Sequence, residues 1–218
     1  MKEELINKFL TSDPRTGSAE LDNRDHPENW PVLFHHNKLH ELSGVETYEE
    51  FSSCNKIKLL EKLLSLNLDS GVIVEIGVSR NKFENTSTYI LTKYKKNNTI
   101  YLGIDIEDKS FLEEKFENTH TLISRSEDYT KVLEKFLELG ITEIDFLFID
   151  GWHSINQVID ELFWVQMVRP GGIIGYHDTN NHPGPSKIIS LFKPELFEVE
   201  RCCQSPLDWG ISFVKKLK

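Results

Sequence analysis

Short apolar runs alternate with segments of helical periodicity over most of this chain. Apolar residues recur at helical spacing around Tyr48 to Leu68, and three more helices are expected at residues 88–96, 129–139 and 155–168. The strand-like runs between and after these segments are VIVEIG, TIYLGIDI, HTLIS, FLFID and GGIIGYHD. Regular alternation of strand and helix predicts a parallel sheet that helices cover on both faces.

The two ends of the chain depart from this alternation. LFEVERC and GISFVKKL read as two strands with a short connection, which predicts an antiparallel hairpin at the sheet edge. Residues 11–43 are rich in Asp, Asn, His and Pro without a clear period, so irregular structure is expected there. We therefore predict a single domain over residues 1–218, with residues 1–45 as an N-terminal extension or lid and residues 70–215 as the core.

Composition narrows the classes of partner. A formal net charge of −10 and a pI near 5.3 give no broad basic surface for nucleic acid. The first residues lack the apolar segment of a signal peptide, and no run approaches membrane-spanning length, so a cytoplasmic protein without a membrane partner is expected. The three cysteines, Cys54, Cys202 and Cys203, form no disulfide or metal pattern, so idle or buried thiols are expected.

Polar side chains occur at the end of nearly every predicted strand. They are Glu75 with Gly77, Asp105, Ser124 to Asp128, Asp150, and His177 with Asp178. The carboxyl ends of parallel strands meet at one edge of the sheet, where open α/β sheets bind ligands. Each residue alone also fits a helix N-cap or a turn, but the same feature at five strand ends favours a ligand site.

The chain resembles the class I S-adenosylmethionine-dependent methyltransferases in the order of its motifs. These are VEIGV, YLGIDI, FLFIDGWHS and RPGGIIGYHDTNNHPG, followed by the hairpin. More narrowly, the chain resembles the branch with a DGxH motif, which includes macrolide sugar O-methyltransferases and cephalosporin-hydroxylase-like proteins. The resemblance implies a Rossmann-like, doubly wound, mostly parallel seven-stranded sheet with an antiparallel C-terminal hairpin. It also implies O-methylation of a hydroxylated small molecule such as a sugar, with or without a metal.

The resemblance assigns roles to the matching residues. The implied cofactor-binding residues for S-adenosylmethionine are Glu75, Gly77, Asp105, Ser126 and Asp128. The implied catalytic residues are Asp150 and His153, with His153 as the general base, and a divalent metal such as Mg would be held by Asp150, His177 and Asp178. An imidazole suits removal of the acceptor's hydroxyl proton near neutral pH, and a metal would lower the pKa of that hydroxyl. The implied partner is a small-molecule hydroxyl acceptor, and a homo-oligomer is left open.

Two features leave other functions open. The stretch Val78–Ser87 contains no further glycine, so a non-catalytic binding protein on a degenerate methyltransferase scaffold is one alternative. A histidine suits softer metals better than Mg, so a metal-dependent hydrolase or oxygenase-like enzyme with His153, His177 and a carboxylate around iron is the other. The N-terminal extension would cover the acceptor pocket in a further hypothesis, with Trp30 and Phe34 as its walls.

Overall fold

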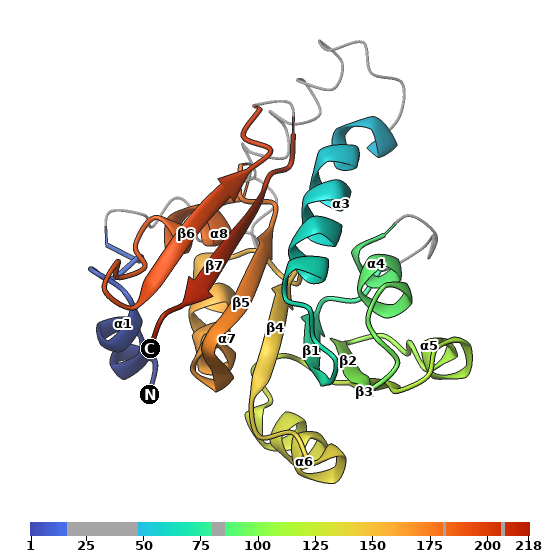
Figure 1. Ribbon diagram of the computed structural model, residues 1–218. Coiled ribbons are helices and arrows are strands. Elements are labelled where there is room, and N and C mark those ends of the chain that lie inside the picture. The colour runs from blue at the N-terminus through green and yellow to red at the C-terminus, as the bar shows by residue number, and fades with distance from the viewer. Residues whose placement is uncertain (17–47, 80–85, 181, 206–207) are drawn as a thin grey trace.

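Seven strands form one mixed sheet in the order β3-β2-β1-β4-β5-β7-β6 (Figure 1). The computed structural model describes residues 1–16, 48–79, 86–180, 182–205 and 208–218. The strands are β1 (Gly71–Ile76), β2 (Thr99–Asp105), β3 (Thr119–Ile123), β4 (Ile144–Ile149), β5 (Val168–His177), β6 (Phe197–Cys202) and β7 (Ile211–Lys216). The predicted strands are thus confirmed, with bounds that differ by a few residues at most.

Strand order reverses between β1 and β4. From β1 the chain moves outward to β2 and β3, whereas β4 returns to the other side of β1 and continues to β5, all in parallel. β7 and β6 then add antiparallel to β5, which confirms the predicted C-terminal hairpin at the sheet edge. In a doubly wound sheet, ligands bind at the carboxyl ends of the two strands that flank such a reversal.

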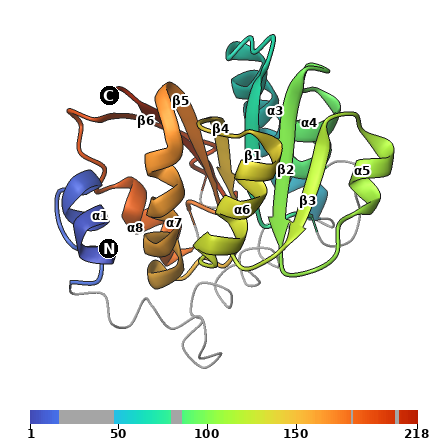
Figure 2. The same cartoon turned by 90° about the horizontal axis from the view of Figure 1, so that it is seen from below.

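Helices cover both faces of the sheet (Figures 1 and 2). On one face lie α1 (Lys2–Phe9), α6 (Tyr129–Leu139), α7 (Ile155–Met167) and α8 (Pro183–Ile189); on the other lie α3 (Tyr48–Ser65), α4 (Ser87–Lys93) and α5 (Phe111–Lys115). Strand β4 supplies both cores, because Leu147 and Ile149 pack on the first face and Phe146 and Phe148 on the second. Successive side chains of a strand point to opposite faces, so a strand that is apolar throughout is buried on both.

Three short helices were not predicted. They are α1, α5 and α8, with 8, 5 and 7 residues. Helices of about two turns or fewer give too few apolar repeats for a periodic signal. Helix α1 is nevertheless held firmly, because Leu5, Ile6 and Phe9 are buried in the same core as α7. The rest of the proposed extension, with Trp30 and Phe34, lies outside the described residues.

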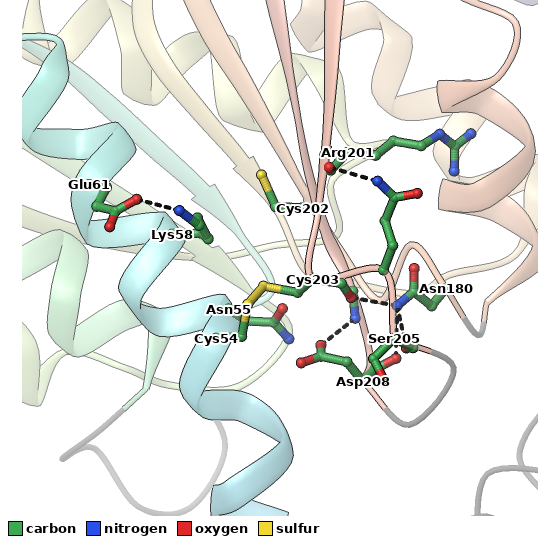
Figure 3. Close-up of a disulfide and its surroundings, with 12 residues drawn as sticks. Cys54, Asn55, Lys58, Glu61, Asn180, Arg201, Cys202, Cys203, Ser205 and Asp208 are labelled. Atoms are coloured by element: carbon green, nitrogen blue, oxygen red, sulfur yellow. Dashed lines mark hydrogen bonds and ion pairs between the residues drawn. A yellow bond between two sulfur atoms is a disulfide. The ribbon is translucent and has the colours of Figure 1, made fainter.

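The prediction that all cysteines are idle thiols is wrong for two of the three. Cys54, in α3, and Cys203, directly after β6, form a disulfide across 149 residues of sequence (Figure 3). Cys202 is a free, buried thiol, as expected. Spacing rules detect only cysteines that are close in sequence, whereas this pair meets because α3 packs against the hairpin strand β7. None of the described helices has the length and apolar character needed to cross a membrane.

Candidate functional site

The ends of β4 and β5 carry the polar residues that the sequence placed at the sheet edge. The amide of Asp150 donates to the carbonyl of Ile76 at 2.8 Å, which ties the end of β4 to the end of β1. His177 is the last residue of β5, and Asp178 follows it with φ +59°. Aspartate tolerates this left-handed conformation better than most residues, but such strain persists mainly at functional sites.

Asp150, His153, His177 and Asp178 form one group, which we call the acid–imidazole cluster. His153 Nε2 lies 3.0 Å from Asp178 Oδ2 and 3.5 Å from Asp150 Oδ1. His177 Nδ1 lies 2.8 Å from Asp178 Oδ1 and 3.1 Å from Asp150 Oδ1. The His153 side chain is only 3% exposed, whereas that of Asp150 is 25% exposed. The structure thus brings together all four residues that the sequence assigned to catalysis and metal binding.

The cluster separates charge between its imidazoles and carboxylates. Burial lowers the pKa of His177, but the charges of Asp150 and Asp178 raise it well above its usual range. For Asp178 burial raises the pKa, and the charge of His177 overrides this to bring it well below its usual range. Hydrogen bonds to Asp150 and Asp178 likewise raise the pKa of His153 against the effect of burial. Without a metal ion, positive charge is therefore favoured on the imidazoles and negative charge on the carboxylates; a divalent ion between the carboxylates would replace that positive charge and favour neutral imidazoles.

Three members of the cluster fit a divalent metal ion. Asp150, His177 and Asp178 each bring one ligand atom within 4.8 Å of the others. Adjacent ligands of an octahedral ion at about 2.1 Å lie about 3.0 Å apart, close to the separations of 2.8 and 3.1 Å around His177 Nδ1. Among the described residues, His177 Nδ1 and Asp178 Oδ1 have no hydrogen-bond partner of acceptable geometry although both are buried. Such atoms suit metal coordination, and the imidazole favours an ion softer than Mg.

Two residues beside the cluster were missed from the sequence. Asn55 of α3 places its Nδ2 3.4 Å from His177 Nε2. His182 places its Nε2 3.4 Å from Asp178 Oδ2 and stacks on Trp209, with ring centroids 6.0 Å apart. His182 is the N-cap of α8, and its amide donates to the Asp178 carbonyl at 3.0 Å, so a turn between β5 and α8 brings the two residues together. No sequence signal connects Asn55 to β5, because only tertiary packing of α3 brings them together.

On the cofactor side, Gly77 and Asp105 organise the turn that follows β1. Gly77 has φ +84°, and a Cβ there would overlap the backbone of Asp150, so no other residue fits this turn without strain. Asp105 accepts hydrogen bonds from the amides of Val78 and Glu107, each at 2.8 Å. A carboxylate offers about four acceptor positions. Asp105 therefore retains capacity for the hydroxyl groups of a ligand at the end of β2.

Glu75 is buried at 0% exposure and cannot offer its side chain to a ligand directly. Its carboxyl group accepts hydrogen bonds from the hydroxyls of Ser87, at 2.8 Å, and Tyr101. Burial raises its pKa to about 7. The side chain thus joins β1 to β2 and to the start of α4, and only the backbone at this position is available to a bound molecule.

Ser126 and Asp128 face different surroundings. Asp128 is exposed and caps α6 by accepting a hydrogen bond from the Lys131 amide at 3.3 Å. Ser126 is buried and donates to Glu161 Oε1 at 3.1 Å. Glu161 was also missed from the sequence, although its position three residues after Val158 places it on the buried face of α7. Burial raises the pKa of Glu161 to about 8.

The doubly wound sheet, with a polar cluster beside its strand-order reversal, defines an α/β protein of the Rossmann-like class. Residues 34–179, more than half of the chain, match the family model described as a methyltransferase domain. The chain therefore belongs to the methyltransferase domain family. No functionally curated protein matches it in sequence.

Solved structures with the same fold include several methyltransferases. MycE from the mycinamycin biosynthetic pathway, in complex with Mg, SAH and mycinamycin VI, has 16% identity and a TM-score of 0.53; the match covers 84% of this chain but only 54% of MycE. The TDP-rhamnose 3′-O-methyltransferase CalS11 of calicheamicin biosynthesis has 15% identity and a TM-score of 0.53; the match covers 88% of this chain and 96% of CalS11. An O-methyltransferase from Bacillus cereus in complex with SAH has 14% identity and a TM-score of 0.51; the match covers 98% of this chain and 100% of that protein. At such identities these similarities establish the fold alone.

Proposed function

We propose that this protein is an S-adenosylmethionine-dependent methyltransferase that O-methylates a hydroxylated small molecule such as a sugar, with help from a divalent metal. The observation that carries the proposal is the acid–imidazole cluster at the ends of β4 and β5, beside the strand-order reversal where such sheets bind ligands. Membership of the methyltransferase domain family supports it. The Mg and SAH in MycE and the sugar acceptor named for CalS11 agree with it.

S-adenosylmethionine, when bound, would supply a methyl group on a cationic sulfur that leaves readily. The turn at Gly77 would place backbone beside the cofactor, with Glu75 fixing that turn from behind. Asp105 would accept hydrogen bonds from the ribose hydroxyls. We assign Ser126 and Asp128 to the adenine side, where their contrasting burial makes Asp128 the more accessible of the two.

On the acceptor side, Asp150, His177 and Asp178 would hold the metal, which lowers the pKa of a bound hydroxyl. His153 would take the hydroxyl proton at Nε2 in its neutral form, which requires that Asp178, 3.0 Å from this nitrogen, turns its carboxylate to the metal and no longer accepts a hydrogen bond from Nε2. Because only 3% of the His153 side chain is exposed, the acceptor must approach past Asp150, which is 25% exposed. Alignment of the acceptor oxygen behind the methyl group would increase the rate of methyl transfer further.

The proposed enzyme also has an expected partner, location and domain organisation. The acceptor is a small molecule, and the net charge of −10 disfavours nucleic acid as a partner. We place the protein in the cytoplasm, without a membrane partner, as a single domain with residues 1–45 as an N-terminal extension or lid. A homo-oligomer stays open in this proposal.

Turnover of purified protein with a panel of hydroxylated sugars and sugar nucleotides tests the proposal, with SAH formation as the readout. We expect metal chelation to abolish SAH formation and metal addition to restore it. His153→Ala should lower turnover about 10²- to 10⁴-fold with unchanged cofactor affinity, whereas His120→Ala, in β3, serves as the matched control and should leave turnover unchanged. Equal turnover of His153→Ala would remove it as the base.

Other outcomes would redirect the assignment. Bound iron without affinity for any S-adenosyl compound would favour the hydrolase or oxygenase-like alternative. Absence of both metal and S-adenosyl binding would favour a non-catalytic binding protein on this scaffold.

A further inference from the structure

Helix α3 reaches the acid–imidazole cluster through one side chain, that of Asn55. This residue is 3% exposed, and its Nδ2 lies 3.4 Å from His177 Nε2, on the opposite side of the ring from the two carboxylates. The side chain also hydrogen-bonds Asp208, and its Oδ1 has no hydrogen-bond partner among the described residues. Figure 3 shows Asn55 between the disulfide and Asp208. Asn55 thus contacts the cluster without being one of its candidate metal ligands.

The disulfide holds Asn55 in this position through its neighbour Cys54. Cys203, the other half of the disulfide, begins the connection from β6 to β7 (Figure 3). Asn180 Nδ2 donates to the carbonyls of Cys203, Ser205 and Asp208, at 2.8, 3.1 and 3.0 Å. Asn180 itself stands two residues after Asp178. The disulfide therefore links the start of α3 to a loop that is already anchored beside the cluster.

We propose that Asn55 is a positioning residue for the His177 imidazole, and that oxidation of Cys54 and Cys203 to the disulfide fixes it there and so tightens metal binding by Asp150, His177 and Asp178. The inference rests on the metal site of the proposed function. It adds redox control to that site.

The physical reason is the hydrogen bond at the ring nitrogen of a metal-bound histidine that does not bind the metal. When one ring nitrogen binds a metal, a hydrogen-bonding group at the other nitrogen fixes the ring orientation and its tautomer; loss of such a group typically costs 10- to 100-fold in metal affinity. His177 presents Nδ1 to the carboxylates and Nε2 to Asn55. When Nδ1 binds the metal, Nε2 carries a hydrogen and needs an acceptor. The Asn55 amide would then turn its Oδ1, which has no hydrogen-bond partner among the described residues, toward Nε2 and give up its hydrogen bond to Asp208.

The redox step is thiol–disulfide exchange. A small-molecule disulfide such as oxidised glutathione accepts two electrons from the Cys54 and Cys203 thiols, the sulfur–sulfur bond forms between them, and two glutathione thiols leave with the two protons. Cys202 takes no part, because burial raises the pKa of its thiol to about 11 and its Sγ lies 3.5 Å from Glu200 Oε1. Disulfides of cytosolic proteins are usually of this transient, sensing kind.

Calorimetric titration with Mn²⁺ tests the inference on full-length protein, either oxidised with glutathione disulfide or reduced with a phosphine that is then removed. Mn²⁺ is the probe because thiolates bind it weakly, so that the freed cysteines do not compete. We expect the oxidised protein to bind one Mn²⁺, and reduction to weaken binding about 10-fold or more. Asn55→Leu should weaken binding to a similar extent with the disulfide intact, and its reduction should then add little.

Two controls separate positioning from loss of folding. Cys202→Ser should behave like the unmodified protein in both redox states, whereas Cys54→Ser should resemble the reduced protein under all conditions. Asn55→Gln, which keeps the amide on a longer stem, should recover part of the affinity that Asn55→Leu loses. Thermal unfolding of each variant shows whether the fold survives at the titration temperature.

Equal Mn²⁺ affinity in the oxidised and reduced proteins would overturn the inference, as would unchanged affinity in Asn55→Leu. Tighter binding by the reduced protein would also overturn it, because the disulfide would then weaken the metal site. A parallel titration with S-adenosylmethionine distinguishes the two proposals. Cofactor binding with a redox-independent Mn²⁺ affinity refutes only the inference, and loss of all cofactor binding refutes the proposed function.

Discussion

Replacement of Glu161 by Gln tests the account of buried charge near the candidate site. Glu161 lies on the inner face of α7 with 1% of its surface exposed. Its Oε1 accepts a hydrogen bond from Ser126 at 3.1 Å, and burial raises its pKa more than the nearby charge of His153 lowers it. Glutamine has the shape of a protonated glutamate, so Glu161→Gln preserves the packing and removes only the ionisation.

The magnitude follows from the pKa of Glu161. In the unfolded chain the carboxyl ionises near 4.5, whereas burial raises its pKa to about 8 in the folded protein. Between these pH values the folded protein binds one more proton, so its stability falls as pH rises, by about 1.4 kcal/mol per pH unit. Over the interval from 4.5 to about 8 this amounts to roughly 5 kcal/mol. Below pH 4.5 the two proteins should be about equally stable.

Urea unfolding of both proteins at pH 5 and pH 8, without metal, measures this difference. Relative to the unmodified protein, Glu161→Gln should gain several kcal/mol of unfolding free energy between pH 5 and pH 8. Glu134→Gln, on the exposed side of α6, is the matched control and should show the pH dependence of the unmodified protein. An identical pH dependence in Glu161→Gln would mean that Glu161 ionises normally, and that the burial argument is wrong.

Three further predictions concern the turn after β1, the end of β2 and the disulfide. Gly77→Ala places a Cβ on the backbone of Asp150 at φ +84°, so thermal unfolding should show a loss of more than ~2 kcal/mol or no cooperative transition at all; an unchanged melting temperature would contradict this turn. Asp105→Ala should weaken S-adenosylmethionine binding about 10-fold in calorimetry, since each charge-assisted hydrogen bond contributes ~1.5–3 kcal/mol, while the exposed control Glu114→Ala should not. Reduction of the Cys54–Cys203 disulfide, which spans 149 residues, should lower the free energy of unfolding in urea by up to about 5 kcal/mol, and equal midpoints would refute that.

Most of the sheet could be predicted because the local sequence of each strand is enough to identify it. An uninterrupted apolar run such as FLFI in β4 is buried on both faces, and the polar residue that ends it marks the sheet edge. The same logic located Asp150, Asp178 and Asp105 at strand ends. Their mutual distances follow from the topology, because parallel strands place their carboxyl ends at one edge.

The residues that the sequence did not reveal are those fixed by tertiary contacts. Asn55 touches His177, and Cys54 bonds Cys203, only because α3 packs over the hairpin, and nothing in the local sequence encodes that placement. The motif around Glu75 predicted a cofactor-binding residue. Its side chain is buried against Tyr101, so only its backbone is accessible to a ligand. Burial and orientation of a side chain depend on neighbours that lie far away in the sequence.

The central claim is that this chain binds an S-adenosyl cofactor beside a metal-binding cluster. Calorimetric titration of the oxidised protein with S-adenosylmethionine and with S-adenosylhomocysteine, with and without Mg²⁺ or Mn²⁺, tests it most directly. The account predicts micromolar affinity for both compounds, weakened about 10-fold in Asp105→Ala, and a separate metal-binding event that is lost in Asp178→Ala. No binding of either compound under any of these conditions would contradict the account.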